Sequence, residues 1–103
     1  MKDLKVKVEN MTSSNGNDVP NQFIITTDKG EYFQSYNSII AFIPKGNFTE
    51  EQHKKGLNKI QLDSNTWDYS RTTGKYRNQF LGEDKKETEK KIKEGIYVLT
   101  DLN

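Results

Sequence analysis

Cysteine is absent from the 103 residues of this chain. Its absence excludes disulfides, thiolate nucleophiles and zinc–thiolate sites. Histidine is almost absent as well, because His53 is the only one and stands in a polar stretch beside Lys54 and Lys55. A single histidine without cysteine does not complete a metal shell. We therefore expect His53 to be solvated, and we expect neither a metal nor another cofactor.

Long apolar runs are also missing, since only 31% of the residues are hydrophobic and 30% are charged. Met1–Lys5 alternates charged and apolar side chains where a secretory signal needs an apolar stretch, and no segment approaches membrane-spanning length. These patterns predict a cytoplasmic protein with no membrane partner. The chain also lacks an excess of charge of one sign, because its 16 basic residues nearly balance its 15 acidic ones. Any attraction for nucleic acid must then come from a local patch.

The patterns that are present predict a single α+β domain over residues 1–103, because a chain of this length has room for one core. We expect a small antiparallel sheet of about five or six strands. The expected strands are 4–8, 23–27, 31–36, 39–43, 57–62 and 96–99, the last one central in the sheet. Asp28-Lys29-Gly30 indicates a hairpin between the second and third strands. The polar residues 12–18 are expected to form a loop.

Two or three short helices are expected to accompany the sheet. Thr49 and Gln52 have the spacing of a capping box, which predicts a short helix within 47–56, a segment that resembles a local insertion. Thr73 is expected to cap a second helix, which should end near Gly82. A third, highly charged helix is expected over residues 85–94. We expect the C-terminal helices to pack on one face of the sheet.

The candidate catalytic groups do not form a recognisable motif. The carboxylates Asp63, Asp68 and Asp101 have no spacing that forces them together, and capping or turn roles explain them better. Hydroxyls occur at 70, 72 and 73 without an activating base nearby in the sequence. The sequence therefore predicts a protein without catalytic residues, which is not an enzyme.

Aromatic and basic residues are densest between Trp67 and Phe80. We take five of them as candidate partner-binding residues: Trp67, Tyr69, Arg71, Lys75 and Arg77. Tryptophan, tyrosine and arginine are the residues most enriched at protein-binding hot spots, which favours a protein partner. The alternative is single-stranded nucleic acid, with aromatic rings stacking on bases and cations contacting phosphates.

A purely structural explanation of the same residues stands beside these two. In it, Trp67 and the helical aromatics pack against the sheet while Arg71 and Arg77 face water. The sequence leaves the oligomeric state open, and a sheet edge that pairs across a dimer is compatible with the pattern.

Four segments taken together resemble a family of small uncharacterised proteins encoded by bacteriophages and mobile elements. These segments are Ser13–Asn17, Asn21–Ile25, Tyr32–Tyr36 and Trp67–Gly82, so the resemblance covers most of the chain. The family supplies no activity and no site residues. The resemblance implies a protein made in the cytoplasm of a bacterial host cell. There it would bind a host or phage protein, for example as an anti-defence inhibitor of a nucleic-acid-processing enzyme.

Overall fold

The computed structural model describes residues 6–103, which form a six-stranded sheet and three helices. The strands lie side by side in sequence order. They are β1 (Lys7–Thr12), β2 (Asp18–Thr27), β3 (Gly30–Ser35), β4 (Ser38–Pro44), β5 (Gln61–Asp63) and β6 (Val98–Thr100). All neighbours are antiparallel except β5 and β6, which are parallel. The helices are α1 (Glu50–Lys54), α2 (Arg71–Leu81) and α3 (Lys85–Lys93). The predicted α+β class is confirmed.

The predicted hairpin between β2 and β3 is present, and its turn requires glycine. Gly30 has a φ of 145°, and a Cβ atom there would lie 2.2 Å from the carbonyl oxygen of Ile43. The next hairpin joins β3 to β4 through only Tyr36 and Asn37. Tyr36 has a φ of 55°, a conformation that side chains larger than asparagine rarely adopt. Both turns are short, and they hold β2, β3 and β4 in register.

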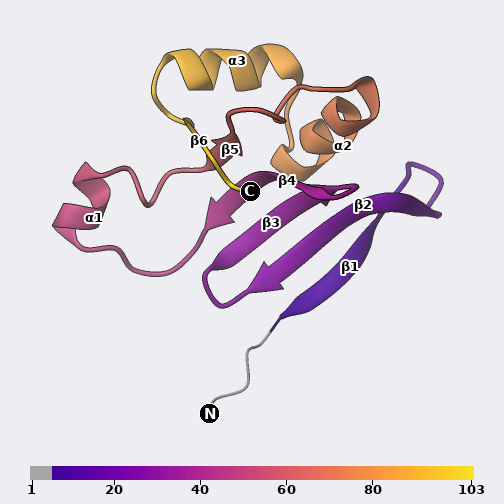
Figure 1. The fold of residues 1–103 in the computed structure, drawn as a ribbon, viewed down its shortest axis with the longest axis horizontal. Helices are drawn as coiled ribbons and strands as arrows, with labels where there is room; N and C mark the ends of the chain where they lie inside the picture. Colours follow the sequence, from indigo (N-terminus) through magenta and orange to yellow (C-terminus); the bar gives the residue numbers. More distant parts are fainter. Residues whose placement is uncertain (1–5) are drawn as a thin grey trace.

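The helices α2 and α3 lie on the same side of the sheet, as expected, and Figure 1 shows both of them above β3 and β4. Phe33 on β3 is fully buried, and its ring centroid lies 5.7 Å from that of Phe80 on α2. The buried hydroxyls of Ser35 and Thr73 are 2.8 Å apart and join the same two elements. On the opposite face of the sheet, Tyr32 stacks on the ring of Phe42, with centroids 4.3 Å apart. Tyr32 and Phe33 therefore project from opposite faces of β3.

Several strands differ in extent from the predicted ones. The strand predicted over 57–62 is wrong for residues 57–60, because β5 covers only Gln61–Asp63. The N-terminal strand runs from Lys7 to Thr12 rather than over 4–8, and Leu4 lies outside the described residues. Val8 is 59% exposed, because β1 is the outermost strand of the sheet. The predicted loop over 12–18 is shorter, since β2 already begins at Asp18.

The last strand lies at the sheet edge rather than at its centre. Two helices, α2 and α3, separate β5 from β6 in the chain, and a connection of this length permits parallel pairing. β6 therefore returns alongside β5, the strand exposed at that end of the sheet.

The short helix α1 begins at the predicted capping box, in which Thr49 and Gln52 bond each other's backbone N–H groups. It stands apart from the sheet in Figure 1, at the end of an excursion between β4 and β5. The identification of residues 47–56 as an insertion stays a prediction. Within the part of the chain that the structure describes, no helix has the length and apolar character needed to cross a membrane.

Candidate functional site

Helix α2 divides its residues between the core and the surface. Its N-cap is Ser70, whose side chain accepts a hydrogen bond from the backbone N–H of Thr73. The prediction that Thr73 caps this helix is wrong, because Thr73 lies inside the first turn and is fully buried. Arg71 and Lys75 are four residues apart and therefore share a helix face, which is exposed. The site is built on this exposed face.

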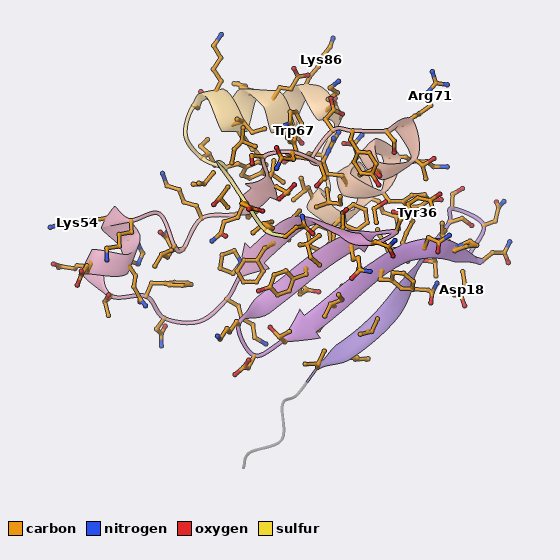
Figure 2. The ribbon with its side chains drawn as sticks, in the orientation of Figure 1. Asp18, Tyr36, Lys54, Trp67, Arg71 and Lys86 are labelled. Atoms are coloured by element: carbon orange, nitrogen blue, oxygen red, sulfur yellow. The ribbon has the colours of Figure 1, made fainter. Side chains whose placement is uncertain are left out.

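Two hollows meet at Arg71 and Lys75. The larger, of about 770 Å³, lies at the start of α2, and the smaller, of about 420 Å³, lies between α2 and the β2 and β3 ends. We call the two hollows together the α2 groove. Its residues are Val19, Pro20, Asn21, Tyr36, Asp68, Tyr69, Ser70, Arg71, Thr72, Gly74, Lys75, Tyr76, Arg77, Asn78 and Lys85. In Figure 2, Arg71 extends outward from α2, and Tyr36 lies below that helix.

Two tyrosines contribute exposed rings to the groove, one in each hollow. Tyr69 is 49% exposed in the larger hollow, and Tyr36 is 48% exposed in the smaller one. Arg71 and Lys75 line both hollows. The groove thus combines two cations with an aromatic ring in each of its parts.

Arg77 does not face water, so that expectation from the sequence is wrong. Its side chain is 1% exposed, and one guanidinium nitrogen donates to the carbonyl oxygen of Trp67 at 2.7 Å and to Asp68 at 3.1 Å. The other terminal nitrogen donates to the side chain of Asn78 at 2.9 Å. The guanidinium also lies over the ring of Trp67, 5.2 Å from its centroid. Arg77 therefore holds the segment before α2 in place and offers little of its charge to a partner.

Trp67 is half-buried and packs against the hydrophobic core. It lines neither hollow of the α2 groove. Of the five candidate partner-binding residues, the structure brings Tyr69, Arg71 and Lys75 together at the surface, and it places Trp67 and Arg77 beneath them. The purely structural explanation thus applies to Trp67, whereas the buried position of Arg77 differs from it.

Asp68 is the carboxylate in the groove, and its two oxygens are already paired with two cations. One oxygen accepts from Arg77, and the other lies 2.7 Å from the Lys85 ammonium. Burial raises the pKa of Asp68, but the hydrogen bonds and charges of Lys85 and Arg77 outweigh burial and hold this pKa below its usual value. Among the described residues, Arg71 and Lys75 take part in no ion pair. Their positive charges remain available.

The other acidic candidates have separate structural tasks. Asp63 is 1% exposed and accepts hydrogen bonds from the backbone of Asn65, Thr66 and Leu102. Asp101 accepts from the backbone N–H of Asn103. Over residues 6–103, no three histidine or acidic side chains gather in a group that could hold a metal ion. The predicted turn roles of Asp63 and Asp101 agree with these contacts.

Sequence reasoning missed Tyr36 and Lys85 as groove residues and misplaced Arg77. The burial of Arg77 had a readable signal, because Thr73, Tyr76, Arg77 and Phe80 follow the i, i+3, i+4, i+7 spacing of a core-facing helix stripe. Tyr36 had no such signal, since its approach to α2 depends on a contact between segments far apart in the chain.

The backbone at Tyr36 leads to a testable prediction. A tyrosine at positive φ costs roughly 1–3 kcal/mol, and glycine there relieves this cost at an entropic loss of about 0.5–1 kcal/mol. Tyr36→Gly is expected to raise the free energy of unfolding by about 0.5–1 kcal/mol, measured by urea denaturation. Tyr69→Gly is the matched control, because Tyr69 is equally exposed and has no positive φ. An equal effect of both substitutions contradicts the strain at Tyr36.

The fold and the groove define the class of this molecule: a small α+β protein whose helix-covered sheet supports a basic surface groove with exposed tyrosines. The chain belongs to a family of unknown function, DUF8033, whose sequence model matches residues 6–95. No curated protein and no solved structure is detectably similar to it.

Proposed function

We propose that this chain is a binding protein without catalytic activity, and that its α2 groove engages an acidic surface of another protein. One observation carries the proposal: the unpaired cations Arg71 and Lys75 share a groove with the exposed rings of Tyr36 and Tyr69. Tyrosine and arginine are enriched at the energetic centres of protein interfaces.

The shape and charge of the groove support a macromolecular partner. The hollows are open surface features that flank Arg71 and Lys75 on α2. The larger one is lined by four basic side chains and one carboxylate, which is paired with two of the four. Complementary charge speeds association and selects the partner. The buried contacts of Arg77 hold the neighbouring Tyr69 segment in place, which reduces the ordering cost of binding.

Single-stranded nucleic acid is the second candidate, because exposed tyrosines suit base stacking and cations suit phosphates. The number of groove cations without an ion pair favours the first candidate over the second. Each phosphate contact contributes roughly 0.7 to the salt slope of single-strand binding, so two free cations give a slope of only about 1.4. This weak electrostatic contribution favours a protein partner.

The biological setting is part of the proposal and rests on the resemblance to bacteriophage and mobile-element proteins. In that setting the partner is a host or phage protein in the bacterial cytoplasm. Inhibition of a host defence or nucleic-acid-processing enzyme is the role we propose for such a complex.

The proposal is tested with the charge-reversed variant Arg71→Glu/Lys75→Glu. A tagged wild-type protein is expected to retain a discrete protein from bacterial lysate after nuclease treatment, and the variant is expected to lose it. The retained protein is then purified and titrated against both forms, with at least about a tenfold loss of affinity expected for the reversal of two interface charges.

The control is Lys54→Glu/Lys55→Glu, which makes the same change in net charge at the exposed C-terminal end of α1. Figure 2 shows Lys54 on the opposite side of the molecule from Arg71. Retention of the partner by this control and its loss in the groove variant support the proposal. Equal binding by both variants contradicts it, and recovery of nucleic acid alone, with no protein surviving nuclease, supports the second candidate.

A further inference from the structure

The strand β1 is bonded on one side only. It pairs with β2 from Lys7 to Asn10, and it is the first strand in the order of the sheet. Figure 1 shows β1 along the outer edge, with no element of the described chain beyond it. An open edge presents backbone N–H and C=O groups that can pair with another strand.

An apolar row crosses the sheet and ends at this edge. The residues directly opposite one another are Phe42 on β4, Tyr32 on β3, Ile25 on β2 and Val8 on β1. Directly opposed residues project from the same face of a sheet. The first three are partly buried, whereas Val8 is 59% exposed. No side chain of the described residues continues this apolar row beyond Val8.

The other face of β1 has two opposite charges. Lys7 and Glu9 flank Val8, and their side chains form an exposed ion pair of 3.2 Å. Glu9 lies opposite Ile24, so both charges project from the helix-covered face, away from Val8. Three successive residues of this edge are therefore basic (Lys7), apolar (Val8) and acidic (Glu9).

We propose that a second copy of this chain pairs with β1, antiparallel, about a two-fold axis through Val8. In this register Lys7 lies opposite Glu9 of the second copy, and Glu9 lies opposite Lys7 of the second copy. Val8 meets its own symmetry mate, so the apolar row continues from one sheet into the next. The same strand supplies both halves of the contact, as a two-fold interface requires.

The charges select this register over its neighbours. A two-fold axis through Lys7 or Glu9 places like charges directly opposite each other, which destabilises the pairing. An axis between two residues places Val8 opposite a charged residue. The two side chains then project from opposite faces of the sheet and do not meet. Only the axis through Val8 matches both the apolar row and the charges.

The dimer is a weak one. The paired segment is short, and its contact area falls well below the roughly 1,600 Å² of stable complexes. Self-association is therefore expected at protein concentrations approaching about 1 mM rather than in the nanomolar range. The α2 groove belongs to other elements, so this inference does not depend on the proposed function.

Charge reversal tests the pairing by analytical ultracentrifugation. The wild type is expected to sediment as a dimer at about 1 mM. Lys7→Glu and Glu9→Lys each place like charges opposite each other at two positions, and each is expected to weaken self-association about tenfold or more. An equimolar mixture of the two variants restores both attractive pairs and is expected to dimerise again. A monomeric wild type, or a mixture no more associated than its components, overturns the proposal.

The register is tested with single cysteines, because the chain has none of its own. Val8→Cys is expected to form a disulfide-linked dimer on mild oxidation, since directly opposed Cβ atoms lie about 4.5–5.5 Å apart. Asn10→Cys on the same strand and face is the control, and its symmetry mate would be about 14 Å away. Linkage that is faster through position 10 than through position 8 overturns the register.

Discussion

Replacing Arg77 by alanine is expected to lower the free energy of unfolding by roughly 3 kcal/mol. The guanidinium is 1% exposed and bonds the Trp67 carbonyl oxygen, Asp68 and Asn78. Truncation leaves these acceptors without their donor and opens a cavity beneath the Trp67 ring. Urea denaturation measures the change.

Arg71→Ala is the matched control, because it removes the same side chain from the same helix at an exposed position. We expect its effect on the free energy of unfolding to stay within about 0.5 kcal/mol. The two arginines are therefore expected to separate folding from the proposed binding: Arg77→Ala destabilises the molecule, and Arg71→Ala weakens only the proposed complex. Similar stability of the two variants contradicts the buried role of Arg77. A variant that combines both substitutions cannot distinguish these effects.

The substitution Asp63→Asn is expected to lower the free energy of unfolding by about 2–3 kcal/mol at pH 7. The buried carboxylate accepts hydrogen bonds from the backbone N–H groups of Asn65 and Thr66, from the Thr66 hydroxyl and from the N–H of Leu102. These bonds join the turn after β5 to the C-terminal segment. An amide offers one oxygen acceptor where the carboxylate offers two, so some of these donors lose their partner.

The same substitution is expected to reduce the acid sensitivity of the fold. Burial raises the pKa of Asp63, but the hydrogen bonds from Leu102, Thr66 and Asn65 outweigh burial, so its pKa in the folded state is below the usual value. A group with a lowered pKa stabilises the fold above its unfolded pKa, which is about 3.9 for aspartate. That stabilisation is lost as the pH falls through about 4 toward the lower folded pKa.

Urea titrations between about pH 7 and pH 3 test this linkage. The wild type is expected to lose stability below about pH 4 more steeply than Asp63→Asn, and the two should converge at low pH. Burial also raises the pKa of Glu83, but hydrogen bonds from Lys91, Thr88 and Tyr97 lower it overall, so a smaller acid sensitivity remains in the variant. Parallel pH profiles for the two proteins contradict the role of Asp63.

Local patterns predicted much of the fold. The β2–β3 hairpin followed from Asp28-Lys29-Gly30 between two β-branched and aromatic runs, and α1 followed from its capping box. Both features depend on residues a few positions apart. The N-terminus of α2 was predicted three residues late, because Ser70 and Thr73 are both acceptable caps and only packing against Ser35 decides between them.

The candidate site was predicted only in part. Tyr69, Arg71 and Lys75 were identified from composition, and the helical period places the last two on one face. The same period places Arg77 on the buried face, but a charged side chain there needs buried acceptors, and Trp67 and Asp68 supply them only after the chain folds back. Tyr36 joins the groove because the β3–β4 turn reaches α2, a contact between distant segments.

The sequence by itself determined a cysteine-free α+β domain, the main hairpin, the approximate positions of the helices and the aromatic and basic composition of the site. These properties follow from covalent chemistry, residue periodicity and turn chemistry, which act over a few residues. Tertiary structure alone decided that β1 and β6 are the edges, that Arg77 is buried and that Arg71 and Lys75 keep their charges unpaired. Strand order, burial and ion pairing depend on contacts between distant segments, and those contacts exist only in the folded chain.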